Sequence, residues 1–250
     1  LIRIFMVIAT MKLCEMYEDL AADLPRIEYK HQQLRPKAVK KFRKALRFPV
    51  WELYEYTSPR SHNTYILYFY ASGRQVAENP EFDIFSVFNG GSKRYFLKWG
   101  CSPYKHTDSD SFIMTRRVDA YSIHFFTRYR ERKLRNTGLD INEVICRYFA
   151  RNKTSFPIEL NEDIKKNYKE YGESANHAMR VHDGLCFVRT AVETHFDPDT
   201  QKEIADAIGF LFETFVDDDT LTDMQKEATF NEGIRYSQKL FKDLIADMGE

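Results

Sequence analysis

Between Pro49 and Trp99 the sequence consists of four short runs of aromatic and β-branched residues, each separated from the next by turn-forming residues. Such runs favour β-strands, because branched and aromatic side chains pack well on a pleated sheet. The connection Asn89-Gly90-Gly91-Ser92 is the clearest, since Asn and Gly tolerate the positive φ angles of a tight hairpin. Connections this short predict a four-stranded antiparallel meander. The expected strands are Val50–Tyr56, Thr64–Ala71, Phe82–Phe88 and Arg94–Trp99.

Apolar residues at helical spacing lie on both sides of this meander. Pro25 is expected to end the first helix and Pro36 to begin the second, because proline breaks a helix interior but fits its first turn. Asp140, followed by Glu143, is a plausible N-cap for a later helix. The expected helices are Met11–Leu24, Pro36–Leu46, Tyr121–Leu134, Asp140–Arg151 and Asn161–Tyr171.

A second group of strand-like runs follows, and the chain then returns to helical spacing. The expected strands are Ala178–Val181, Leu185–Val192 and Phe210–Val216, with His182-Asp183-Gly184 as a tight turn, before one long helix from Thr220. The predicted class is therefore α+β: an antiparallel meander with N-terminal helices, a central helical pair, a second group of strands and a long C-terminal helix. Residues 1–101 and 118–250 would form two domains or one continuous domain.

The composition excludes several classes of protein. A chain with 43% hydrophobic and 15% aromatic residues is globular rather than disordered. Its four cysteines include no C-x-x-C pair, so neither a zinc ribbon nor a disulfide framework is expected. The apolar opening is interrupted by Arg3 and lacks a small-residue cleavage site, which argues against a signal peptide. We expect a cytoplasmic protein with no membrane span.

The formal net charge of zero hides two strongly charged segments. Residues 26–47 carry nine Lys or Arg and one Glu, a local charge of +8. Residues 193–227 carry eleven Asp or Glu and two Lys, a local charge of −9. Opposed segments of this kind either bind external partners or neutralise each other within the fold or across a dimer.

The expected helix Tyr121–Leu134 concentrates residues that can carry chemistry. His124, Arg128, Glu131, Arg132 and Arg135 fall at offsets of 0, 4, 7, 8 and 11, within a sector of about 100° on an α-helix. An imidazole can move a proton near neutral pH, and guanidinium groups can hold a phosphate as charge builds on it. The alternative is a solvated helix face on which Glu131 pairs with a neighbouring arginine.

The pattern His-x-x-x-Arg-x-x-Glu-Arg, followed by Gly138-Leu-Asp-Ile-Asn-Glu-Val144, resembles the signature of the small RelE-like and BrnT-like toxin ribonucleases. The resemblance spans residues 121–216. In those families a helical pair precedes a short antiparallel sheet. The resemblance implies a metal-independent endoribonuclease without a cofactor, in which His124 is the acid or base and Arg128 and Arg132 clamp the phosphate.

The leading hypothesis is thus a nucleic-acid-directed protein whose partner is RNA or another nucleic acid; whether it is an enzyme stays open. The expected nucleic-acid-binding residues are Lys37, Lys40, Lys41, Arg43, Lys44 and Arg135. The alternative is a non-catalytic interaction or self-associating module, which docks a protein partner or a second copy through the basic helix Pro36–Arg47 and the acidic segment Asp217–Glu227. Metal-ligating groups occur at His182 and Asp183 and again at His195, Asp197 and Asp199, but turn chemistry accounts for the acidic residues there, so no metal is expected.

Overall fold

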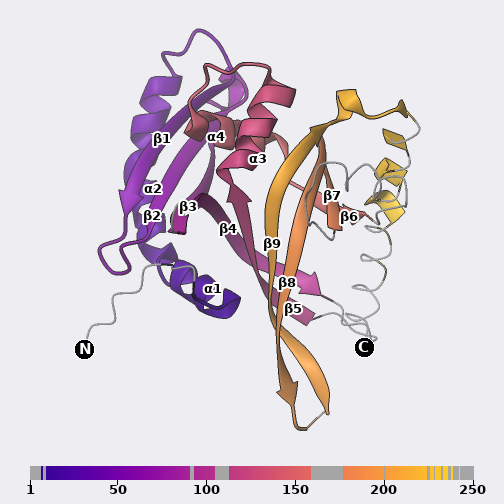
Figure 1. Cartoon of the computed structure of the whole chain (residues 1–250). Coiled ribbons are helices and arrows are strands. Elements are labelled where there is room, and N and C mark those ends of the chain that lie inside the picture. Colours follow the sequence, from indigo (N-terminus) through magenta and orange to yellow (C-terminus); the bar gives the residue numbers. More distant parts are fainter. Residues whose placement is uncertain are drawn as a thin grey trace. The chain divides into compact units, whose positions relative to one another are not determined.

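The computed structural model of the chain describes residue 7, residues 10–90, 93–104, 113–158, 177–199 and 201–223, and scattered positions between 226 and 242. Figure 1 labels its elements. The helices are α1 (Leu13–Ala21), α2 (Leu24–Phe42), α3 (Ile123–Tyr129) and α4 (Ile141–Arg151), with short helical segments η1 (Arg74–Val76), η2 (Arg130–Leu134) and η3 (Asp218–Thr220). The strands are β1 (Val50–Thr57), β2 (Thr64–Ala71), β3 (Glu81–Gly90), β4 (Lys93–Tyr104), β5 (Ile113–Ser122), β6 (Ser155–Ile158), β7 (His177–Val181), β8 (Gly184–Asp197) and β9 (Lys202–Asp217).

Hydrogen bonds join these strands into one mixed sheet in the order β1-β2-β3-β4-β5-β9-β8-β7-β6. β5 and β9 run parallel, with residues 116–121 beside 207–212. The expected α+β class, a meander with a separate second group of strands, is therefore wrong. β5 and β9 can run parallel because α3, α4 and β6–β8 lie between them in the chain, a connection long enough for a crossover.

The chain divides into two compact units, residues 1–99 and 100–250, and β4 begins in the first and ends in the second. In the first unit β1–β4 are successive antiparallel neighbours, as expected for this stretch. The expected hairpin joins β3 to β4, but Asn89 and Gly90, which were expected in its turn, belong to β3 and pair with Arg94 and Lys93. Gly91 and Ser92 lie outside the described residues.

Helix α2 differs most from the expectation within the first unit. It begins at Leu24 rather than near Pro36, and it contains Pro36 in its interior. Pro25 occupies the first turn, where proline is tolerated because its missing N–H has no helical partner. An interior proline costs about 3 kcal/mol. Burial of apolar side chains on the inner face of α2 offsets this cost, since each large one contributes roughly 1.5–3 kcal/mol.

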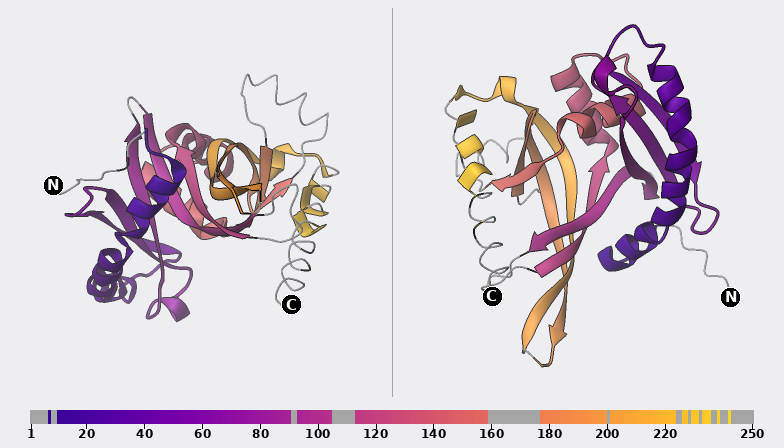
Figure 2. Two further views of the ribbon diagram at one scale, coloured as in Figure 1. Left: turned by 90° about the horizontal axis from the view of Figure 1, so that it is seen from below. Right: turned by 180° about the vertical axis from the view of Figure 1, so that it is seen from behind.

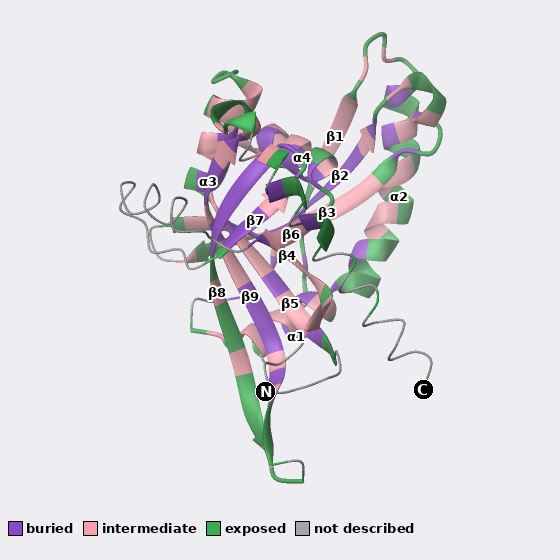
Figure 3. Ribbon diagram, turned by 90° about the vertical axis from the view of Figure 1, so that its right-hand side faces the viewer, coloured by how far each residue is buried: buried purple, intermediate pink, exposed green. Residues whose placement is uncertain are grey.

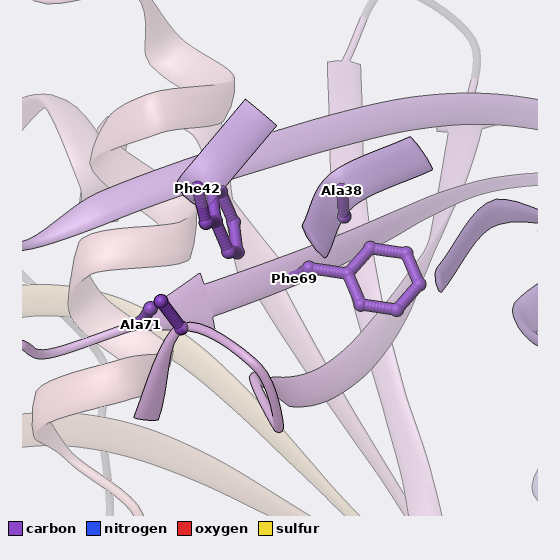
Figure 4. Close-up of a cluster of buried hydrophobic side chains, with 5 residues drawn as sticks. Ala38, Phe42, Phe69 and Ala71 are labelled. Carbon is purple, nitrogen blue, oxygen red and sulfur yellow. The ribbon is translucent and has the colours of Figure 1, made fainter. Parts of the chain in front are cut away.

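The inner face of α2 packs on the sheet of the first unit through a cluster of buried side chains. Figure 4 shows Phe42 and Ala38 of α2 against Phe69 and Ala71 of β2. All four are at most 2% exposed. Figure 2 shows α2 running along the strands of this unit. The buried cluster fixes which side of α2 faces solvent.

The second unit is built around aromatic residues of α3, α4 and β9. Phe125, Phe126 and Tyr129 of α3 are fully buried, and their rings contact Tyr148 of α4. Tyr129 also meets Phe215 of β9 edge-on, with 5.0 Å between ring centroids. The aromatic side of the expected helix is thus confirmed as its anchor.

Three expectations about the second unit need correction. The expected helix from Tyr121 begins only at Ile123, because Tyr121 and Ser122 end β5 and Ser122 caps α3. Strands β5 and β6 were not expected. The expected long C-terminal helix is not among the elements that the described residues form, and Thr220, its expected start, lies in η3. The expected helix Asn161–Tyr171 lies outside the described residues.

Candidate functional site

His124 lies near the start of α3 and is exposed. The hydroxyl of Ser122 accepts a hydrogen bond from the backbone N–H of Phe125 at 3.1 Å, which starts the helix beside His124. No hydrogen bond or ion pair joins His124 to a residue of the described part of the chain. The imidazole is therefore accessible, but no carboxylate among those residues orients it as a general base requires.

The three arginines expected to hold phosphate make other contacts. Arg128 pairs with Glu131 at 3.1 Å, which is the salt-bridged alternative weighed from the sequence. Arg132 donates a hydrogen bond to the backbone carbonyl of Phe215. Arg135 pairs with Asp219 at 2.6 Å. The structure therefore does not bring His124, Arg128 and Arg132 together as a phosphate clamp.

The helix geometry changes after Tyr129. Residues 130–134 form a π-helical turn, and Arg135 closes it in the left-handed conformation, with φ of 50°. A constant 100° per residue therefore applies only as far as Tyr129, so the positions predicted for Glu131, Arg132 and Arg135 no longer follow from it. The hydrogen bond to the Phe215 carbonyl ties the Arg132 guanidinium to β9.

The acidic residues just after β9 are neutralised within the second unit. Lys133 pairs with Asp217 at 2.9 Å, Arg135 pairs with Asp219, and Arg180 pairs with Asp218. Asp217 is only 1% exposed. These three carboxylates therefore do not form the free acidic surface that the interaction-module alternative requires.

Asp183 is the centre of a buried polar cluster in the turn between β7 and β8. Its carboxylate accepts hydrogen bonds from Arg151 (2.6–3.1 Å), the Tyr129 hydroxyl (2.6 Å) and Asn152 (3.0 Å). Burial raises the pKa of Asp183, but these donors, Arg151 above all, outweigh burial and lower it to about 2. Both carboxylate oxygens of Asp183 already accept hydrogen bonds from these side chains, so the carboxylate stabilises the fold rather than holding a metal. None of the residues that the structure describes forms a cluster of three or more metal-ligating side chains.

Asp23 forms a matching cluster in the first unit. It accepts hydrogen bonds from Ser58, Ser61, Tyr65 and Arg60, and its side chain is fully buried. Burial raises the pKa of Asp23, but the hydrogen bonds from Ser61, Tyr65, Ser58 and Arg60 lower it by more. The cluster ties the connection between β1 and β2 to the start of α2.

The basic segment 26–47 lies at the surface. Seven of its nine Lys and Arg residues are exposed, and the other two, Lys30 and Arg35, are half-buried. Two of the exposed cations have carboxylate partners: Lys41 pairs with Glu52 at 2.5 Å, and Arg43 pairs with Glu78 at 2.5 Å. The structure thus separates the expected nucleic-acid-binding residues into paired and unpaired groups.

Four of the cations without a carboxylate partner lie on one face of α2, which Figure 3 shows with exposed turns, and Lys44 follows in the turn after the helix ends at Phe42. The four on the helix fall at offsets of 0, 4, 11 and 14 from Arg26, within a sector of about 80° on an α-helix. At 1.5 Å per residue these four extend over about 21 Å. None of the five pairs with a carboxylate of the described part of the chain. We call these residues the α2 basic stripe: Arg26, Lys30, Lys37, Lys40 and Lys44.

Arg26 and Lys30 were not among the expected site residues. They were missed because the helix was expected to begin at Pro36, which leaves both outside it. A helix starting at Leu24, with Pro25 in its first turn, places both on the stripe. The signal that could have found them is therefore the tolerance of proline in the first turn of a helix.

Comparison of the chain with protein-family profiles, with curated protein sequences and with solved structures found no match. The resemblance to RelE-like and BrnT-like ribonucleases therefore stays a prediction. Within the described residues, every helix is too short or too polar to cross a membrane.

Proposed function

We propose that this chain binds nucleic acid through the sugar–phosphate backbone, with the α2 basic stripe as the contact surface. The observation that carries the proposal is a row of cations without carboxylate partners in the described part of the chain, four on one face of α2 and Lys44 just beyond its end. Lysine and arginine side chains in such a row attract phosphates and release condensed counterions on binding. Binding of this kind is largely independent of sequence, because the phosphate backbone carries no base information.

Catalysis receives less support than binding. The expected endoribonuclease needs guanidinium groups free to hold a phosphate, whereas Arg128 pairs with Glu131 and Arg132 donates to a backbone carbonyl. The alternative of a protein-interaction module is also weakened, since Asp217, Asp218 and Asp219 already have cationic partners.

Salt dependence of binding tests the proposal. If all five cations of the stripe contact duplex phosphates, the logarithm of the binding constant should fall with the logarithm of salt concentration with a slope of about −4.5. Removing two contacts, as in Lys37→Gln/Lys40→Gln, should reduce that slope by about 2 and weaken binding about 50-fold near 0.1 M salt. Fluorescence anisotropy with labelled DNA and RNA measures both quantities.

A matched control removes the same charge elsewhere. Lys93 and Lys202 are exposed and lie outside the stripe, so Lys93→Gln/Lys202→Gln changes net charge equally. We expect this variant to bind like the wild type. Equal losses in both double variants would show that net charge alone drives binding, and absence of binding by the folded wild type would end the proposal.

A further inference from the structure

Tyr29 is an aromatic residue placed among the cations at the exposed side of α2. Its relative exposure is 60%, which is unusual for a ring that contributes strongly to stability when buried. Residues three and four positions apart are neighbours on a helix surface. Tyr29 therefore lies next to Arg26 of the stripe on one side and next to Gln32 and Gln33 on the other.

The two glutamines add hydrogen-bonding groups to this surface. Both side chains are exposed. Gln32 has no hydrogen-bond partner among the residues described, and Gln33 makes one long contact, in which its carbonyl accepts from Lys30 at 3.4 Å. A glutamine amide offers both donors and an acceptor, the combination that matches the edge of a nucleobase.

An aromatic ring at a nucleic-acid surface distinguishes single strands from duplexes. A base can stack on a tyrosine only when one of its faces is uncovered, and in a duplex both faces are covered by neighbouring base pairs. Single-strand binding proteins combine a cationic surface that follows the backbone with aromatic side chains on which bases stack. The α2 surface presents the same two components.

We infer that Tyr29, Gln32 and Gln33 form a contact site for an unpaired base of a single-stranded nucleic acid. Tyr29 stacks on the base, the two amides bind its edge, and Arg26 and Lys30 hold the adjoining phosphates. The inference rests on the proposed function, because the stripe supplies the attraction to phosphate. It adds the substrate class: single-stranded rather than duplex nucleic acid.

The test compares a single strand with a duplex. Binding of labelled oligouridylate of about 12 nucleotides and of a DNA duplex of about the same length is measured by anisotropy for each variant. Tyr29→Ala should weaken single-strand binding about tenfold and change duplex binding less than about twofold. Tyr29→Phe keeps the ring and should retain single-strand affinity.

Phe196 provides a matched control, because it is 58% exposed on β8 in the second unit, at a strand end that Figure 3 shows as exposed. Phe196→Ala removes an equally exposed ring and should leave both affinities unchanged. Thermal unfolding of each variant checks that the fold is retained.

The outcomes separate the two proposals. If Lys37→Gln/Lys40→Gln weakens binding but Tyr29→Ala affects single strand and duplex equally, the base site is wrong and the phosphate surface stands. If neither variant changes binding, the proposed function itself fails. Anionic vesicles form a third arm: a loss of vesicle binding in Tyr29→Ala that equals the loss for oligouridylate overturns the base site in favour of a lipid surface.

Discussion

Arg151 and Asp183, which are 32 residues apart in sequence, form a bidentate ion pair in which both oxygens of the buried carboxylate accept from one guanidinium. Asp183 is 2% exposed, and Tyr129 and Asn152 bind the same carboxylate. The pair joins the end of α4 to the turn between β7 and β8.

Asp183→Ala should lower the free energy of unfolding by about 3 kcal/mol, because it leaves Arg151, Tyr129 and Asn152 without their shared acceptor. Urea denaturation followed by circular dichroism measures this loss. Glu131→Ala is the control, since it removes only the exposed pair with Arg128 and should cost less than about 0.5 kcal/mol. Equal effects of the two changes would show that the Asp183 cluster does not hold the second unit together.

The stability of the chain should fall in acid. The pKa of Asp183 is lowered from 3.8 to about 2 in the folded state, so folding favours the ionised carboxylate. The resulting stabilisation of about 2 kcal/mol is complete above about pH 5 and is lost as pH falls from about 4 to 2. Unfolding curves between these pH values measure it. Asp183→Asn should flatten this part of the pH profile, and an unchanged profile would contradict the assignment.

Tyr65→Phe should destabilise the first unit by about 2 kcal/mol. The Tyr65 hydroxyl donates to the buried carboxylate of Asp23 at 2.7 Å, and the phenylalanine leaves that carboxylate one donor short. Tyr29→Phe serves as the control, because it removes a hydroxyl from an exposed ring and should change stability by less than about 0.5 kcal/mol. Chemical denaturation distinguishes the two variants.

His124→Ala tests the ribonuclease hypothesis. The side chain is exposed, so the substitution should change stability by less than about 0.5 kcal/mol. If the wild type cleaves RNA, His124→Ala should abolish cleavage while the protein stays folded. Arg132→Ala is expected to lower the free energy of unfolding by about 1 kcal/mol, since it removes a hydrogen bond to the Phe215 carbonyl. A loss of cleavage in this variant alone would therefore not identify Arg132 as a phosphate clamp. Failure of the folded wild type to cleave varied RNA substrates would remove the hypothesis.

Local pattern located the four strands between Val50 and Trp99, because turn-forming residues separate them, although β3 continues through Asn89 and Gly90 and β4 continues to Tyr104. It failed for β5, where Arg116, Arg117 and Asp119 interrupt the apolar alternation that indicates a strand. Those side chains are half-buried, and Arg117 and Asp119 pair with each other at 2.8 Å. Partial burial of a charged strand depends on its partners, which local spacing does not contain.

The same limit applies to the candidate sites. The basic character of residues 26–47 was visible in the sequence, but separating Lys41 and Arg43 from the α2 basic stripe required Glu52 and Glu78. Likewise, the spacing of His124, Arg128 and Arg132 held only for a regular helix. The contact between Arg132 and the Phe215 carbonyl depends on β9, which lies more than 80 residues later in the chain.

The packing of Phe42 and Ala38 on β2 also bears on how quickly a ligand can be captured. Because α2 is already fixed on the sheet, its cations keep constant spacing, and binding needs to order side chains but no backbone. Association with such a preorganised charged surface is steered by long-range attraction, so its rate constant falls steeply as salt is added. Polyanions that bind the stripe would then differ mainly in their dissociation rate constants.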